Sequence, residues 1–105
     1  MISHAEITRR KITRGSILNM LYVSQTAPMM VQTIELALLP ENPQISSEMA
    51  PNINFLVDRG YIAVIQPDEP GIAPLRGALV RITDRGQDVV EGTTRDASIL
   101  FADGI

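Results

Sequence analysis

The stretch of residues 46–91 constrains the fold most strongly, because its pattern predicts a helix, then a β-hairpin, then a short helix. Its first part carries an apolar stripe at helical spacing, formed by Met49, Ile53, Leu56 and Val57. Asn52, Asn54 and Asp58 lie off this stripe, so we expect them on the exposed face of the helix. Gly60 follows directly and predicts the end of the helix, because glycine readily adopts positive φ.

Two segments rich in β-forming residues follow, at residues 61–65 and 79–82. The connection between them, residues 67–77, contains three prolines and two glycines, which predicts a hairpin with a long, stiff tip. Thr83 is expected to cap a final short helix, and Gly92 is expected to end it.

The first half of the chain begins with a helix-start signal. Ser3 and Glu6 fit a capping box, so we expect a helix from His4 to about Ser24. Gly15 lies in the middle of this segment and disfavours helix, which leaves a kink or a break open at that point.

A proline marks the start of the second predicted helix. Pro28 is expected in its first turn, where the missing N–H would have had no helical partner. Met30, Ile34 and Leu38 are expected on the buried side of this helix. Pro40 is expected to end it, because the residue before a proline is driven out of helical geometry.

The third helix is expected to start near Ser46 or Ser47, with either a loosened first turn or a start at Pro51 instead. Two helices joined by a short polar turn and followed by a hairpin form a helix-turn-helix with a wing. We therefore predict a mainly α fold with a small β-hairpin (α+β), a winged helix-turn-helix of three helices, a two-stranded wing and a short C-terminal helix. Residues 1–92 would form this domain and residues 93–105 a tail.

Composition argues against several classes of function. The chain has no cysteine and only one histidine, His4, so we predict no disulfide, no metal site and no cofactor. It has no Gly-rich phosphate loop and no Ser-His-acid set, which argues against an enzyme. No apolar run approaches the roughly 20 residues that span a bilayer, so we expect no membrane contact and a cytoplasmic location.

Two segments resemble a known family. Residues 56–62 read LVDRGYI and residues 82–86 read ITDRG. These resemble winged-helix regulators of the MarR, PadR and ArsR kinds, in which a glycine-terminated helix end and an apolar-Thr-x-x-Gly junction recur. The size, the basic pair Arg9-Arg10 and the ending TDRGQDVVEG of residues 83–92 look like small winged-helix proteins of Mu-like bacteriophages and prophages.

The resemblance implies a transcriptional regulator that binds double-stranded DNA, with the third helix in the major groove. The expected base contacts are polar side chains of this helix, namely Ser46, Ser47, Asn52 and Asn54. The expected phosphate contacts are basic residues, namely Arg9, Arg10, Lys11, Arg59 and Arg76.

The net charge of the chain and the few basic residues of the third helix leave a second function possible, one without DNA binding. The net charge is −3, which argues against strong non-specific binding to nucleic acid, although the first fifteen residues carry +3. The third helix has no Lys or Arg before Arg59, and Glu48 is expected in its exposed first turn. The alternative function is a winged-helix protein–protein interaction module in phage development or assembly, without DNA binding.

The tail contains the apolar residues Ile99, Leu100 and Phe101 after a polar spacer. One small core is not expected to bury all of them, so we predict a homodimer in which this segment packs across the interface. The alternative is a frayed chain end.

Overall fold

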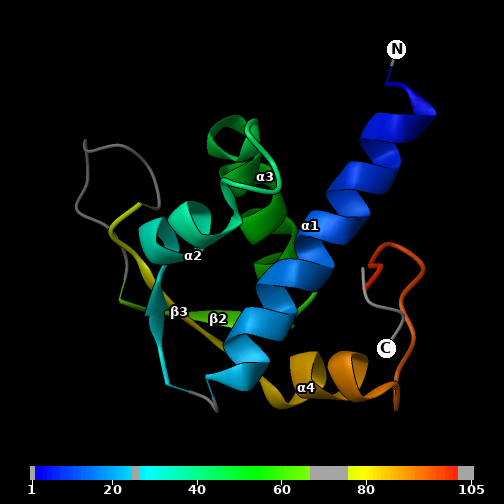
Figure 1. The fold of residues 1–105 in the computed structure, drawn as a ribbon. Coiled ribbons are helices and arrows are strands. Elements are labelled where there is room, and N and C mark those ends of the chain that lie inside the picture. Colours follow the sequence, from blue (N-terminus) through cyan, green and yellow to red (C-terminus); the bar gives the residue numbers. More distant parts are fainter. Residues whose placement is uncertain (1, 25–26, 67–75, 102–105) are drawn as a thin grey trace.

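The computed structural model describes residues 2–24, 27–66 and 76–101. Within these ranges the fold is α+β, with four helices and a small three-stranded antiparallel sheet (Figure 1). The elements in chain order are α1 (His4–Val23), β1 (Met29–Met30), α2 (Val31–Leu38), α3 (Ile45–Asp58), β2 (Ile62–Gln66), β3 (Leu79–Ile82) and α4 (Asp84–Glu91). The coarse fold class expected from the sequence is confirmed.

Helix α1 begins where its capping residue predicts. The Ser3 hydroxyl accepts a hydrogen bond from the Glu6 amide at 3.1 Å. The helix runs through Gly15 without interruption, so the break that the sequence left open does not occur. Gly15 has a different role, because a Cβ at this position would collide with the carbonyl oxygen of Leu100. The glycine therefore lets the C-terminal segment approach the helix backbone.

The second helix begins later than predicted, because the chain first forms a strand. Residues 29–30 pair antiparallel with residues 79–80 of β3. Helix α2 starts only at Val31, so the placement of Pro28 in its first turn is wrong. Met30, expected on the buried side of a helix, is 40% exposed. Two residues are too few for sequence periodicity to indicate a strand, and β1 exists because β3 offers backbone partners.

Helix α3 begins slightly earlier than expected, at Ile45, and continues through Pro51 rather than starting there. In its first turn, the Ser47 amide donates to the carbonyl three residues earlier, that of Gln44, at 3.2 Å. Pro51 cannot donate to the Ser47 carbonyl, which removes one helical hydrogen bond. Pro51 lies on the exposed side of the helix, where water can replace that donor.

The hairpin pairs β2 with β3, as the sequence predicts. Val64 lies opposite Val80, and the register shifts between Val64 and Gln66, which indicates a β-bulge. The strand order β1-β3-β2 places the second strand of the hairpin in the centre of the sheet. Most of the predicted hairpin tip, residues 67–75, lies outside the described residues.

One threonine joins the end of α3 to the start of α4. The Thr83 hydroxyl donates to the Gly60 carbonyl at 2.6 Å and accepts from the Gly86 amide at 3.1 Å. Gly60 and Gly92 adopt φ of 77° and 80° at the ends of α3 and α4, as predicted. Gly86 packs so closely against the Tyr61 carbonyl that no Cβ fits between them. The start of α4 is therefore held directly against the hairpin.

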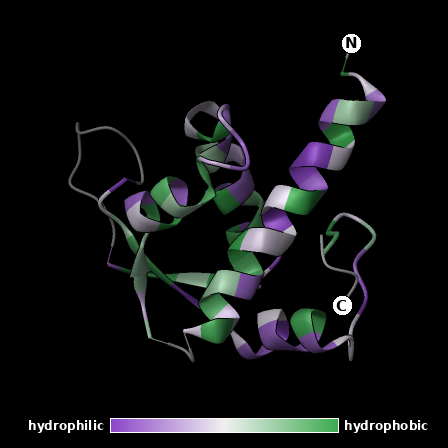
Figure 2. Ribbon diagram, in the orientation of Figure 1, coloured by the Kyte–Doolittle hydropathy of each residue, from purple (hydrophilic) through white to green (hydrophobic). Residues whose placement is uncertain are grey.

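The core draws on the second half of α1, on α2, α3 and α4, and on the sheet. Figure 2 shows the first half of α1 mainly in hydrophilic colours and the second half mainly in hydrophobic colours. The predicted stripe residues that are buried are Ile34, Leu38, Met49, Ile53 and Leu56. Val57, expected in the same stripe, is only half-buried.

The C-terminal segment packs on its own chain. Ile99 is 5% exposed and belongs to the core, and Phe101 packs against that core. The Leu100 amide donates to the Lys11 carbonyl of α1 at 3.1 Å. The expectation that Ile99 packs across a dimer interface is therefore wrong, and residues 96–101 are not a frayed end. Hydrogen bonds from Arg14 to Ser98 and from Arg59 and Tyr61 to Asp96 help to offset the conformational entropy that this segment loses when it docks.

Replacing Gly86 with alanine tests how closely α4 approaches the hairpin. The added Cβ would collide with the Tyr61 carbonyl and press on Ile82, so the free energy of unfolding should fall by about 1–3 kcal/mol. Urea denaturation followed by circular dichroism measures this change. Gly92→Asn is the control, because no atom lies near a Cβ there and asparagine tolerates the left-handed backbone. A loss no larger than that of the control would contradict the close packing.

Candidate nucleic-acid interface

Helix α3 presents an exposed face of mostly uncharged residues. Ser47, Pro51, Asn54 and Asp58 recur at one-turn spacing, and all four are exposed. The single charge among these four belongs to Asp58, in the last turn of the helix. The first part of the face therefore offers a hydroxyl and an amide without a net charge.

Asn52 does not belong to this face, so its expected exposed position is wrong. The residue is only 1% exposed. The Nδ2 group donates to the Glu48 carbonyl at 2.9 Å, and Oδ1 accepts from Arg14 Nε at 3.0 Å. Asparagine is usually exposed, but here α1 covers the position and Arg14 satisfies the buried amide.

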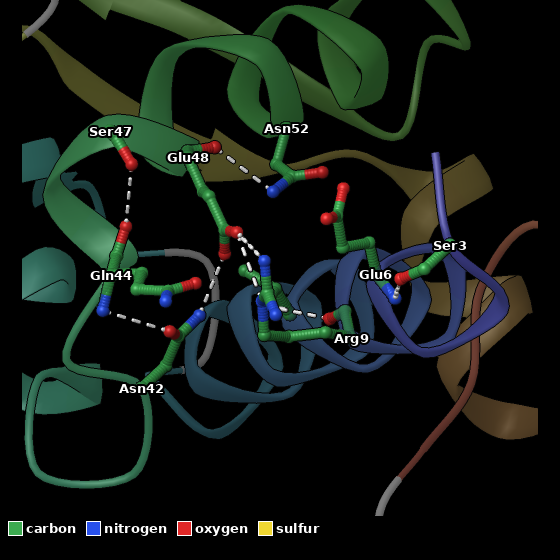
Figure 3. Close-up of polar contacts among 9 residues, drawn as sticks. Ser3, Glu6, Arg9, Asn42, Gln44, Ser47, Glu48 and Asn52 are labelled. Carbon is green, nitrogen blue, oxygen red and sulfur yellow. Dashed lines mark hydrogen bonds and ion pairs between the residues drawn. The ribbon is translucent and has the colours of Figure 1, made fainter. Parts of the chain in front are cut away.

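Glu48 turns away from the exposed face and toward α1 (Figure 3). Its carboxylate accepts a hydrogen bond from Arg9 Nη2 at 2.6 Å and one from the side-chain Nδ2 of Asn42 at 2.9 Å. The Glu48 side chain is only 13% exposed, so the expectation of an exposed acid in the first turn is wrong. The hydrogen bond from Arg9 lowers the pKa of Glu48; burial opposes this effect, and Asn42 reinforces it. The charge of Glu48 is thus neutralised between the two helices.

Arg14 and Arg59 lie beside Phe55 of α3, and Arg10 is close enough to repel Arg14; we call these three residues the arginine cluster. The guanidinium carbons of Arg14 and Arg59 lie 3.8 Å and 4.6 Å from the centroid of the Phe55 ring. Arg14 donates to the Ser98 carbonyl at 3.1 Å and has no carboxylate partner among the described residues. Burial, followed by repulsion from Arg10 and Arg59, lowers the pKa of Arg14. The cluster therefore holds closely spaced positive charge.

Asp96 supplies negative charge beside this cluster. Its carboxylate accepts hydrogen bonds from Arg59 Nη1 at 2.8 Å, from the Tyr61 hydroxyl at 2.7 Å and from the Ser98 amide at 2.8 Å. Burial works against ionisation of Asp96, but the hydrogen bonds from Tyr61 and Ser98 and the charge of Arg59 outweigh it, so the pKa is below its ordinary value. The same hydrogen bond to Asp96 raises the pKa of Tyr61.

The basic segment of α1, Arg9 to Lys11, contains one residue in an ion pair and two residues without one among the described residues. Arg9 is bound to Glu48, whereas Arg10 and Lys11 form no ion pair with any other described residue. The first turn of α1 extends away from the rest of the chain (Figure 1), whereas this segment lies where the helix contacts α3 and Leu100. Arg10 and Lys11 are half-buried but retain charge that an external anion can meet.

Arg76 lies beside the other side of α3, at its start. Its Nη2 atom is 3.8 Å from the Glu35 carboxylate, and its side chain is 52% exposed. Glu35 is buried on α2 and also accepts a hydrogen bond from the Ser46 hydroxyl at 3.3 Å. Ser46 is therefore engaged with Glu35, although the residue itself is exposed.

The structure adds two residues that sequence reasoning missed, Arg14 and Phe55. A signal for both was present, because Arg14 follows Arg10 by four residues and Phe55 precedes Arg59 by four. Residues at this spacing share a helix face. The spacing does not indicate that the α1 face with Arg14 packs against the α3 face with Phe55.

Other kinds of site have less support in the described part of the chain. Residues 2–24, 27–66 and 76–101 contain no group of three or more His, Cys, Asp or Glu side chains placed to hold a metal ion. None of the described helices combines the length and the apolar composition that a membrane crossing requires. Among the same residues, every buried polar side-chain atom has a hydrogen-bond partner.

Comparison of the chain with models of known protein families, with curated proteins and with solved structures finds no match.

Replacing Glu48 with glutamine tests the ion pair between α1 and α3. The pKa of Glu48 is lower in the folded chain than in the unfolded chain, so its ionised form stabilises the fold above the unfolded-state pKa. That stabilisation is lost as the pH falls through the lower, folded-state value. Between about pH 5 and pH 2, the free energy of unfolding should therefore fall more steeply for the wild type than for the variant.

Urea denaturation at a series of pH values measures the two slopes. Glu41→Gln is the matched control, because Glu41 is exposed and forms no ion pair with a described residue. Equal slopes for the wild type and Glu48→Gln would show that the Arg9–Glu48 pair does not stabilise the fold.

Proposed function

We propose that the chain is a winged helix-turn-helix protein that binds double-stranded DNA and regulates transcription. In this proposal α3 enters the major groove and the hairpin of β2 and β3 is the wing. The order of the elements supports it, because α2 and α3 are joined by residues 39–44 and the hairpin follows at once. The resemblance of residues 83–92 to proteins of Mu-like phages makes phage gene control the setting.

The observation that carries the proposal is the distribution of charge around the exposed face of α3. Ser47 and Asn54 offer uncharged hydrogen-bonding groups, of the kind that read base edges. Phe55, which contacts Arg14 and Arg59, follows this face on one side of the helix. Ser46, which shares the Glu35 carboxylate with Arg76, lies on the other side by helical spacing. A helix in the major groove meets bases with its face and phosphates along its sides, which matches this arrangement.

The pairing of Glu48 removes the main electrostatic objection. An exposed acid in the first turn of α3 would repel DNA phosphates. Arg9 binds this carboxylate and holds it against α1, so Arg9 acts mainly by neutralising Glu48. The net charge of the whole chain, −3, therefore does not describe the surface around α3.

One observation favours the alternative, a protein–protein interaction module without DNA binding. Leu36 on α2 is 58% exposed, and Leu39 just after the helix is 40% exposed. Exposed apolar side chains suit a protein partner better than DNA. Absence of duplex binding at low salt, in the wild type and in every variant, would favour this alternative.

Replacing Arg10 and Lys11 together with alanine tests the phosphate contacts. Affinity should fall to a similar degree for all DNA sequences, because phosphates carry no sequence information. The slope of log affinity against log salt should flatten by up to about 1.8, from about 0.9 per lost phosphate contact. Fluorescence anisotropy with a labelled random-sequence duplex measures both quantities. Arg85→Ala with Arg95→Ala is the control, because it removes the same charge from two exposed residues on and after α4, and it should change the slope less.

Replacing Asn54 with alanine tests base recognition by α3. If Asn54 contacts an adenine, the preferred site should lose about 1–3 kcal/mol of binding free energy and the preference at one base pair should relax. The salt slope should stay the same, because no phosphate contact is removed. A selection from a random duplex library, followed by affinity measurements, shows both effects. Asn19→Ala on α1 is the control, and an identical preference for both variants would exclude Asn54 from base reading.

A further inference from the structure

Residues 96–101 lie across α1 and the end of α3, and we call them the C-terminal strap. Figure 1 shows this segment beside α1. Its polar contacts join Asp96 to Arg59 and Tyr61, Ser98 to Arg14, and Leu100 to Lys11. The strap therefore binds the same arginines that flank the exposed face of α3.

The contacts of the strap resemble those that a nucleic-acid phosphate would make. The Asp96 carboxylate accepts from the Arg59 guanidinium at 2.8 Å, as an anionic phosphate oxygen also can. The Ser98 carbonyl takes one N–H of Arg14 at 3.1 Å. While the strap is docked, Arg14 and Arg59 are occupied by groups of this chain.

Apolar burial holds only part of the strap. Ile99 is buried, but Leu100 is 44% exposed and Phe101 is half-buried. One buried side chain does not offset the entropy lost when the whole segment is ordered. The polar contacts to Arg14, Arg59 and Tyr61 must therefore contribute to docking, so a competitor for the two arginines weakens it.

We propose that the C-terminal strap is autoinhibitory: it competes with DNA phosphates for Arg14 and Arg59, and duplex binding releases it. This inference rests on the proposed DNA binding and adds a regulatory segment to the same surface. The coupling is reciprocal, since any change that releases the strap raises the affinity for DNA, and DNA raises the fraction of released strap.

Two variants of the full chain release the strap by different means. Gly15→Ala introduces a Cβ that collides with the Leu100 carbonyl oxygen, and it changes no charge. Alanine also favours helix more than glycine does, so α1 itself should persist. Asp96→Ala removes the bonds to Arg59 and Tyr61. If both variants raise DNA affinity, the cause is release of the strap and not the change in net charge, because Gly15→Ala leaves the net charge unchanged.

Anisotropy with a labelled random-sequence duplex measures the effect on binding. Both variants should bind at least about threefold more tightly than the wild type, and the salt slope should steepen by up to about 1.8 as two arginines become available to phosphate. Asp88→Ala is the matched control, because it removes one negative charge from α4 outside the strap. It should change affinity less than Asp96→Ala does.

Amide hydrogen exchange reports the position of the strap directly. The Leu100 amide, which donates to Lys11, should be protected in the free wild type and exchange faster in Gly15→Ala. Addition of a saturating duplex to the wild type should also speed its exchange. Protection that persists at saturation would overturn the inference.

The outcomes separate this inference from the proposed function. If the wild type and both variants bind the duplex equally, DNA binding stands and autoinhibition is wrong. If only the variants bind, both proposals are supported. If no form binds at low salt, both fall.

Discussion

The hydroxyl of Thr83 connects parts of the chain that are distant in sequence. It donates to the Gly60 carbonyl after α3 and accepts from the Gly86 amide in α4, while the Thr83 amide donates to the Tyr61 carbonyl at 3.0 Å. These bonds tie both ends of the hairpin to the end of α3. The direction in which the hairpin leaves α3 is thereby fixed.

The surface around α3 depends on how α1 distributes charge. Helix α1 brings Arg9 to Glu48 and Arg14 to Asn52, so one acid and one amide that would otherwise face solvent become part of the packing between the helices. What remains exposed on α3 is largely neutral, with cations beside it. A chain of negative net charge can in this way present a surface suited to an anionic partner.

Placing Arg14 and Arg59 near one aromatic ring carries an electrostatic cost, because like charges in a partly buried site repel. The chain reduces this cost with the Phe55 ring, a neutral carbonyl and one carboxylate from its own C-terminal segment. A carboxylate placed this way can be replaced by another anion. The contacts that complete the fold of the C-terminal segment therefore also determine how much positive charge Arg14 and Arg59 present to solvent.

The sequence by itself determined the features that short-range interactions control. Helix caps at Ser3 and Thr83, helix ends at Gly60 and Gly92, and the paired strands of the hairpin follow from residues close to one another in the chain. These signals were sufficient for the α+β class and for most element boundaries.

Only the tertiary structure decided the rest. Strand β1 forms because β3 offers it backbone partners, Asn52 is buried because α1 lies over it, and Gly15 is needed because Leu100 approaches from far along the chain. Each of these depends on residues that are separated by more than thirty positions. Local pattern carries no information about such encounters, because it records which face of an element is polar and not which other element that face will meet.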